Sequence, residues 1–347
     1  MGELMMRKIL LALLSTTLGL GVAAAAAATG GYHVTGSIAI GGEGGWDYVT
    51  ADAAAHRLYV SHATCVQVVD TRTNTIIGEI PDTLGVHGIA LARSLGRGYI
   101  SDGRADTVTV FDLKTLKLLA TIKVTGGNPD AIAFEPVTRR VFTFNGRGHN
   151  ITAIDTATNT VVGTIDLGAK PEFAVADGTG EVFFNLESTS QLAVLDARTL
   201  KVRARWPLAP GREPTGLAID RKHRRLFSVC GNGLMVIVNA DTGKVVATEP
   251  IGRGVDGAAF DPGTGTAFAS AGQGVLTVVR EDSPTTFTVV ANVPTKRGAR
   301  TVALDTSAHR LYLPTARFGP PPSPTPQHQH RWPRVLPGTF EVLIVSR

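Results

Sequence analysis

Cysteine, long apolar runs and charge of one sign are all scarce in this sequence. Only Cys65 and Cys230 occur among its 347 residues. They fall four sequence repeats apart, too far for a disulfide that needs Cα atoms within about 7 Å. We therefore predict two free thiols and no disulfide framework. After residue 28 no apolar stretch is long enough to cross a membrane as a helix, which excludes further spans of that kind.

The positive charge of the chain is small and dispersed. The formal net charge is +5, and Glu3, Arg7 and Lys8 together contribute +1 of it. The remaining excess of about +4 is spread over turns, whereas nucleic-acid binding requires a clustered basic surface. We therefore expect no nucleic-acid partner.

Compact catalytic motifs are also missing. The sequence contains no G-x-S-x-G elbow, no P-loop and no C-x-x-C pair. The glycine-rich stretch 41–45 is not followed by a helix, so it is interpreted as a flexible link and not as a phosphate-binding loop. The sequence therefore identifies no specific reaction.

Residues 1–28 have the layout of a secretory signal peptide. Arg7 and Lys8 form a short basic region, residues 9–22 are almost wholly apolar, and 23–28 are alanines suited to cleavage. An uncleaved membrane anchor is the alternative, but the apolar core is short for a span. We predict a cleaved signal peptide, a periplasmic or secreted protein, and a single domain over 29–347.

The rest of the chain repeats a unit of four short strands about every 42 residues, a period typical of propeller blades. The first strand of each unit is rich in Ala and Gly and usually ends in an acid. Its seven copies are YVTAD at 48–52, IALA at 89–92, AIAFE at 131–135, FAVAD at 173–177, GLAID at 216–220, GAAFD at 257–261 and TVALD at 301–305. Small side chains suit the crowded axis of a propeller, and the second and third strands carry the β-branched and aromatic residues. The pattern predicts an all-β, seven-bladed β-propeller.

The two ends of the chain predict how the ring closes. The seventh unit stops at its third strand, whereas residues 33–42 have the pattern of a fourth strand before the first unit. We expect this N-terminal strand to complete the last blade; an open solenoid is the alternative. A proline-rich insertion at 317–338 interrupts unit seven and is expected to be a surface loop, either a tolerated insertion or a lid.

The units resemble the YVTN-type β-propeller repeats of YncE-like exported bacterial proteins. The resemblance is carried by RLYVS at 57–61, VVDT at 68–71 and NTIIG at 74–78, and by the matching stretches of unit three. It covers the chain from about His33 to Val345. It implies a seven-bladed propeller and no single activity, because such repeats occur in proteins with unrelated roles.

One residue per unit, five positions before the end of the first strand, is expected to line one mouth of the central channel. These residues are Asp47, His87, Asp130, Glu172, Thr215, Asp256 and Arg300. The loop after the second strand adds His62, Asp102, Asn145, His149, Asn185 and Cys230 to the same face. Polar residues that converge from several repeats form binding sites, and crowded carboxylates favour a bound cation or a raised pKa. A solvated channel without a ligand is the plain alternative.

Two functions are consistent with this arrangement. The first is an exported binding or scaffolding module, a monomer, whose mouth contacts a small ligand or a protein partner through Asp47, His87, Asp130, Glu172, Asp256 and Arg300. The second is a metal-dependent lyase or hydrolase at the same mouth, with His62 and His87 as ligands of a divalent metal ion or as a general base. A purely structural envelope protein is a third, weaker interpretation. The identity of the ligand and of any catalytic residue stays open.

Overall fold

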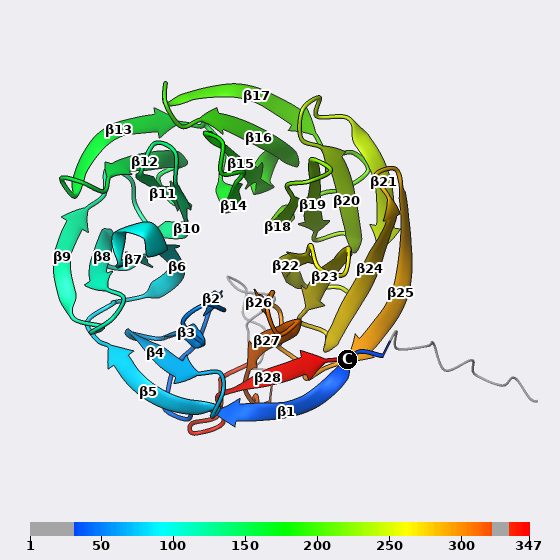
Figure 1. Ribbon diagram of the computed structural model, residues 1–347, viewed down its shortest axis with the longest axis horizontal. Coiled ribbons are helices and arrows are strands. Elements are labelled where there is room, and N and C mark those ends of the chain that lie inside the picture. The colour runs from blue at the N-terminus through cyan, green and yellow to red at the C-terminus, as the bar shows by residue number, and fades with distance from the viewer. Residues whose placement is uncertain (1–30, 321–332) are drawn as a thin grey trace, which may run out of the picture.

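Seven four-stranded antiparallel sheets follow one another around a ring in the computed structural model, which describes residues 31–320 and 333–347 (Figure 1). This confirms the seven-bladed propeller. The predicted signal peptide and residues 321–332 of the proline-rich insertion lie outside the described residues. No helix in the described part of the chain is long and apolar enough to span a membrane.

The blades are numbered in chain order, and each runs from the axis to the rim. Blade 1 contains β2 (Val49–Asp52), β3 (Arg57–His62), β4 (Cys65–Asp70) and β5 (Thr75–Ile80). Blade 2 contains β6 (Val86–Ala92), β7 (Arg97–Asp102), β8 (Thr107–Asp112) and β9 (Leu118–Lys123), with the 3-10 helix η1 (Arg93–Leu95). Blade 3 contains β10 (Pro129–Glu135), β11 (Arg140–Asn145), β12 (Asn150–Asp155) and β13 (Thr160–Asp166).

The remaining blades repeat this order. Blade 4 contains β14 (Pro171–Ala176), β15 (Glu181–Leu186), β16 (Gln191–Asp196) and β17 (Lys201–Pro207), with η2 (Glu187–Thr189). Blade 5 contains β18 (Pro214–Asp220), β19 (Arg225–Cys230), β20 (Leu234–Asn239) and β21 (Val245–Pro250). Blade 6 contains β22 (Val255–Asp261), β23 (Thr266–Ala271), β24 (Val275–Ser283) and β25 (Thr286–Pro294). Blade 7 contains β26 (Ala303–Asp305), β27 (Arg310–Thr315), β28 (Glu341–Ser346) and, at its rim, β1 (His33–Ala39).

The N-terminal strand closes the ring as the sequence predicts. Strand β1 pairs antiparallel with β28, in a register that runs from His33 opposite Ser346 to Ala39 opposite Glu341. Just before it, Tyr32 is 1% exposed and packs edge-on against Phe268 of blade 6, with ring centroids 5.3 Å apart. The closing segment is therefore held by a ladder within blade 7 and by an aromatic contact with its neighbour.

Small residues occur on the innermost strands because the backbone of the next blade lies against them. A Cβ on Gly216 of β18 would lie 2.8 Å from the backbone nitrogen of Ala258, and a Cβ on Gly257 of β22 would lie 2.8 Å from that of Val302. Both distances are shorter than carbon–nitrogen contact allows. The Ala and Gly content of the first strands is thus a requirement of blade packing near the axis.

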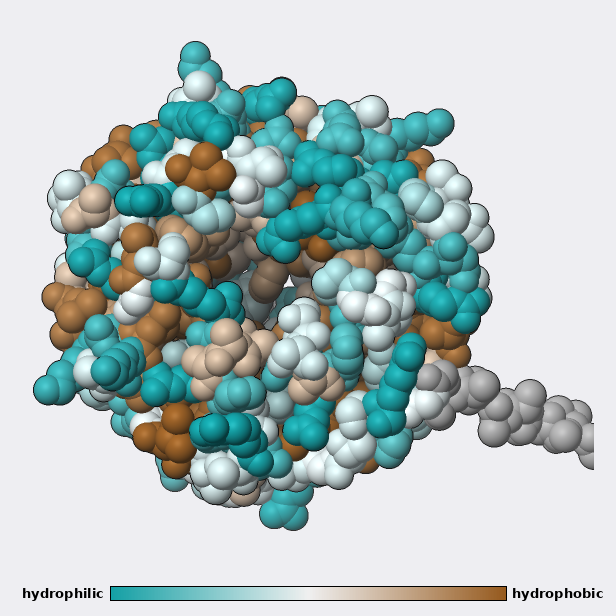
Figure 2. All heavy atoms as spheres, in the orientation of Figure 1, coloured by the Kyte–Doolittle hydropathy of each residue, from teal (hydrophilic) through white to brown (hydrophobic). Residues whose placement is uncertain are grey.

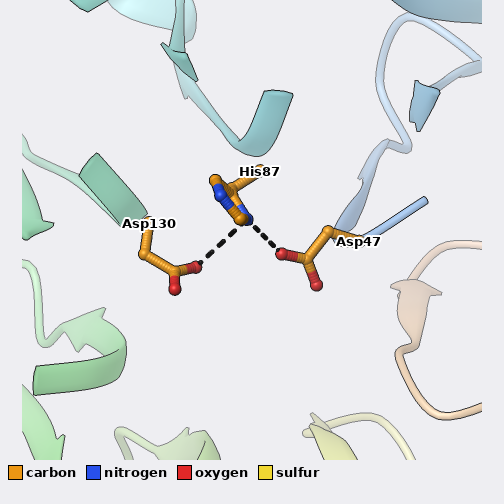
Figure 3. Close-up of side chains that lie close together, drawn as sticks. All are labelled: Asp47, His87 and Asp130. Atoms are coloured by element: carbon orange, nitrogen blue, oxygen red, sulfur yellow. Dashed lines mark hydrogen bonds and ion pairs between the residues drawn. The ribbon is translucent and has the colours of Figure 1, made fainter. Parts of the chain in front are cut away.

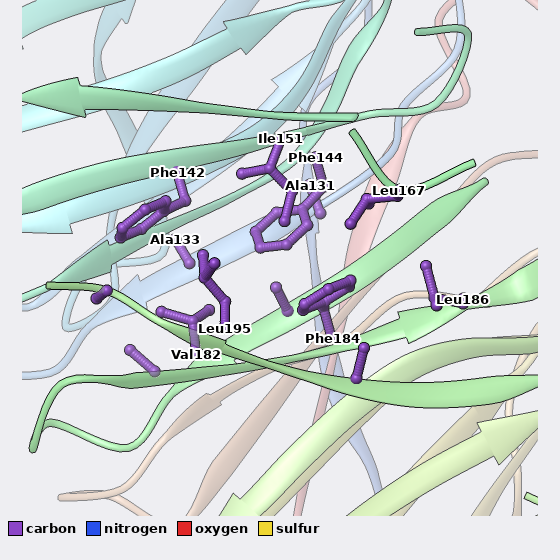
Figure 4. Packing of buried hydrophobic residues seen from close by; sticks show 14 of the residues in the cluster. Ala131, Ala133, Phe142, Phe144, Ile151, Leu167, Val182, Phe184, Leu186 and Leu195 are labelled. Atoms are coloured by element: carbon purple, nitrogen blue, oxygen red, sulfur yellow. The ribbon is translucent and has the colours of Figure 1, made fainter. Parts of the chain in front are cut away.

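Large apolar side chains fill the spaces between neighbouring blades. Between blades 3 and 4 the rings of Phe144 and Phe184 lie 5.2 Å apart, with Ile151, Leu186 and Leu195 around them (Figure 4). The aromatic content is low, but most of these rings are buried where two sheets meet.

Both cysteines are free, as predicted. Burial raises the pKa of the Cys65 thiol to about 11 and that of the Cys230 thiol to about 12. Both thiols are therefore protonated and poor nucleophiles at neutral pH.

Candidate functional site

The residues expected at the channel mouth all lie at the start of an innermost strand. His87, Asp130, Glu172 and Asp256 belong to β6, β10, β14 and β22, whereas Asp47 lies two residues before β2 and Arg300 three residues before β26. Figure 3 shows His87 between Asp47 and Asp130, with all three side chains directed toward one point. The polar mouth is defined here as Asp47, His87, Asp130, Glu172, Asp256 and Arg300.

Five of these six side chains form one continuous chain of ion pairs. His87 Nδ1 lies 2.5 Å from Asp47 Oδ2 and 3.6 Å from Asp130 Oδ1. Arg300 Nη2 lies 3.5 Å from Asp47 Oδ1, and its Nε lies 2.7 Å from Asp256 Oδ2. The order Asp130, His87, Asp47, Arg300, Asp256 therefore connects five blades across four junctions, including the junction between blades 7 and 1.

Glu172 belongs to a separate group that the sequence analysis did not identify. Lys170 Nζ lies 2.5 Å from both Glu172 Oε1 and Glu187 Oε2. Lys170 is the turn residue just before β14, and Glu187 begins the 3-10 helix η2. The only sequence signal for this lysine is its position two residues before Glu172. Thr215, the seventh predicted residue, donates its hydroxyl to the carbonyl of Val255, 3.1 Å away.

Buried polar side chains on the second strands hold the mouth residues in place. Ser61 Oγ accepts the N–H of Asp47 at 2.8 Å, and Ser101 Oγ donates to the carbonyl of Asp130 at 2.5 Å. Asn185 Nδ2 donates to the carbonyl of Thr215 at 2.7 Å. Because these groups are buried and fully used, the backbone at the mouth is fixed before any ligand arrives.

Acidic groups outnumber basic groups around the mouth. In the described part of the chain, three basic side chains, His87, Lys170 and Arg300, form ion pairs with five acids, namely Asp47, Asp130, Glu172, Glu187 and Asp256. Burial, reinforced by the charge of Asp47, raises the pKa of Asp130 to about 7 and that of Asp256 to about 6. Burial acts to lower the pKa of His87, but its bond to Asp47 and the charge of Asp130 outweigh this and raise it to about 9.

An aromatic pair lies across the channel below the acids. The Tyr48 ring of blade 1 meets the Phe173 ring of blade 4 edge-on, with centroids 5.1 Å apart. A small cavity beside this pair is lined by Gly88, Ala131 and Ala174. Burial and then the charges of Asp130 and Glu172 raise the pKa of Tyr48 well above its usual value, so its hydroxyl stays neutral. The space-filling view shows the ring hollowed at its centre (Figure 2).

The two histidines expected as metal ligands do not lie in one cluster. Among the described residues, His87 has ligand atoms within 4.8 Å of those of Asp47 and Asp130, and His62 belongs to no such group. The His62 ring instead packs against Phe340, with centroids 4.7 Å apart, and burial lowers its pKa. Phe340 also stacks on Trp46, so His62 is part of the packing between blades 1 and 7.

The other polar residues expected on this face have mixed surroundings. Asp102 is buried, and its Oδ2 accepts from Thr107 at 3.0 Å and Thr109 at 2.8 Å. Burial raises its pKa to about 7.

The base of the proline-rich insertion forms an antiparallel bridge between Phe318 and Val335. The rest of the expected lid, residues 321–332, lies outside the described residues.

No protein-family model matches the chain, and no curated protein matches it. Solved structures do. A chain of hydrazine synthase from Kuenenia stuttgartiensis superposes with a TM-score of 0.69 at 18% identity, covering 78% of this chain and 92% of that one. The structure of U3-55K gives 0.72 at 9% identity, covering 89% and 97%. The WD40 repeats of RRP9 give 0.71 at 10% identity, covering 92% and 98%. At these identities the likeness shows the propeller fold alone.

Proposed function

We propose that this chain is an exported β-propeller binding or scaffolding module whose polar mouth contacts a small ligand or a protein partner. β-Propellers commonly serve as binding or scaffolding modules. The observation that carries the proposal is the excess of partly buried carboxylates at the mouth over the three basic groups among them. Such an excess favours a ligand that brings positive charge, because that charge would offset both the burial and the repulsion that raise the pKa values of Asp130 and Asp256.

Removal of two mouth carboxylates is expected to abolish this binding. The Asp130→Asn, Asp256→Asn double variant should lose the thermal shift that the purified chain shows with hits from a library of small amines, amino acids and cationic peptides. Each lost charge-assisted contact is worth about 1.5–3 kcal/mol, or roughly tenfold or more in affinity. Asp82→Asn is the matched control, because Asp82 is an exposed acid with a φ of 60°, which asparagine tolerates. The same hits with the same affinity in the double variant would place the ligand elsewhere.

A metal-dependent lyase or hydrolase is the second candidate, favoured by the convergence of Asp47, His87 and Asp130. One nitrogen and two carboxylates suit a divalent ion such as Zn²⁺ or Mn²⁺. Asp130 Oδ1 is buried without a hydrogen-bond partner, as a ligand atom of this kind would be. Such an ion would polarise a bound oxygen, while Arg300 and Lys170 are placed to hold an anionic part of a substrate.

Metal analysis separates the two candidates. If the second is correct, the purified chain should carry a divalent metal by elemental mass spectrometry. The His87→Gln variant should then carry one equivalent less, and the unfolding temperature of the parent chain should fall on chelation. Equal metal content in the two chains would remove the metal-dependent candidate at this mouth.

A further inference from the structure

The face opposite the mouth carries a regular pattern of bonds between neighbouring blades. At three junctions in the described part of the chain, the acid at the end of a first strand pairs with a basic side chain from the first turn of the following blade. Arg93 Nε of blade 2 lies 2.8 Å from Asp52, Arg224 Nη1 of blade 5 lies 2.9 Å from Asp177, and His309 Nδ1 of blade 7 lies 2.7 Å from Asp261. These pairs join neighbouring blades on the face opposite the mouth.

Asp220 of blade 5 has no such partner among the described residues. The corresponding turn of blade 6, residues 262–265, has no basic side chain. The fourth position of this turn is Gly265, with a φ of 61°. The equivalent positions in blades 5 and 7 are Arg224 and His309, with φ values of 56° and 51°. Within the described ranges, Glu135 of blade 3 and Asp305 of blade 7 also have no ion pair with the next blade, and groups of their own turns donate to their carboxylates. Asp220 likewise accepts the N–H groups of Lys222 and His223. The blade 5–6 junction therefore differs in what blade 6 places beside Asp220.

Blade 6 brings a second carboxylate to this place instead of a base. The N–H of Glu281 bonds to the carbonyl of Gly265 at 2.8 Å. The same backbone bond is made in other blades by neutral residues, namely Thr71, Leu113, Thr156, Ala197 and Ala240. The Glu281 side chain is 3% exposed, and its Oε2 has no hydrogen-bond partner. A buried carboxylate beside a second acid is strongly unfavourable unless a cation joins them.

One histidine lies between the two acids. His223 Nδ1 is 2.7 Å from Asp220 Oδ2 and 3.1 Å from Glu281 Oε1. The three side chains offer ligand atoms that all lie within 4.8 Å of one another. The charge of nearby Arg225 acts to lower the pKa of Glu281, but its guanidinium forms no ion pair with either acid and donates to the carbonyls of Pro284, His223 and Arg224.

We propose that Asp220, His223 and Glu281 bind a first-row divalent metal ion, which joins blades 5 and 6 in the place that Arg93, Arg224 and His309 take at three other junctions. The donor set of one imidazole nitrogen and two carboxylate oxygens suits Zn²⁺ and Mn²⁺ more than Mg²⁺ or Ca²⁺. The His223 side chain is 35% exposed, so the ion reaches the site from solvent. Its role is to hold the ring together, and it is separate from any ligand at the polar mouth.

Zinc titration of the purified chain tests this site in a His87→Gln background, which removes the histidine of the mouth. After treatment with a chelator, this chain should bind one equivalent of Zn²⁺ by calorimetry and unfold at a higher temperature with it. Adding Glu281→Gln or His223→Gln should weaken zinc binding by on the order of tenfold or more. Adding His309→Gln should leave it unchanged, because His309 pairs with Asp261 alone in an otherwise similar turn.

The Glu281→Gln substitution should also shift the unfolding temperature in opposite directions without and with metal. A purely structural role of Glu281 would not produce this reversal. Without metal the variant should unfold at a higher temperature than its parent, because the repulsion between Glu281 and Asp220 is removed. With saturating Zn²⁺ the order should reverse. If zinc fails to bind, or binds equally to the Glu281→Gln variant, the proposal is wrong. Equal stability with and without zinc would also overturn it.

Discussion

A chain that begins at Gly41 should be less stable than one that begins at Gly31 by on the order of 3–6 kcal/mol, and should lose the well-defined ring. The deletion removes Tyr32 and Ile38, which are 1% and 2% exposed, and burial of each such side chain contributes about 1.5–3 kcal/mol. It also leaves β28 as an unpaired edge of a strand whose central four residues are buried. Urea unfolding and the oligomeric state on a sizing column measure both consequences, because unpaired edges associate.

A peptide with the sequence of residues 31–40 should restore the shortened chain by adding the missing strand in trans. The same peptide with Ile38→Asp should not, because Ile38 packs in the apolar cluster with Tyr312 and Val342. Val34→Thr in the full chain is the matched control: Val34 lies on the same strand but is 38% exposed, so its change should stay within about 0.5 kcal/mol. An equally stable chain without residues 31–40 would show that the closing strand is dispensable.

The closing strand could be predicted because the repeat leaves a visible gap. The seventh unit has only three strands, and one extra strand precedes the first unit. Pairing of β1 with β28 supplies the missing fourth strand of the last blade. The small residues near the axis could also be predicted from the sequence, because the Ala and Gly content recurs in every first strand. In the structure Gly216 and Gly257 face the backbone of the next blade. These features are local or periodic, so they are visible in a single sequence.

The candidate site was only partly predictable. One position per unit gave the ring of acids, His87 and Arg300, because equivalent positions in a propeller meet at one mouth. His62 was expected on the same face because the loop after the second strand lies there, but its ring packs against Phe340, which follows the insertion. Lys170 was missed because its partner Glu187 comes from another loop of the same blade, and the group around Glu281 was missed because its members come from neighbouring blades. Repeat counting fixes which face a residue occupies, but not which neighbour its side chain contacts.

The mouth also sets how stability depends on pH. In the folded chain the pKa of Asp130 is raised to about 7 and that of His87 to about 9, against about 3.9 and about 6.5 in an unfolded chain. Between about pH 4 and about pH 9 the folded state therefore holds more protons than the unfolded state, so the free energy of unfolding falls as pH rises through this window. The contribution of His87 is complete below about pH 6.5 and is lost by about pH 9. The penalty from Asp130 is absent below about pH 4 and complete above about pH 7.

Two substitutions at the mouth should therefore change stability with opposite sign. Asp130→Asn should stabilise the chelator-treated chain by on the order of 1–3 kcal/mol near pH 8 and flatten the pH profile, because a buried, incompletely compensated carboxylate is removed. His87→Gln should destabilise it by a similar amount near pH 6, because Asp47 and Asp130 then lose their shared cation. Urea unfolding followed by tryptophan fluorescence, from about pH 5 to about pH 9, measures both, with Asp82→Asn as the neutral control. A profile that rises with pH, or two variants that shift stability in the same direction, would contradict this account of the mouth.

The same linkage predicts that a cationic ligand binds the mouth more tightly at pH 8 than at pH 6, because protons compete for the same carboxylates.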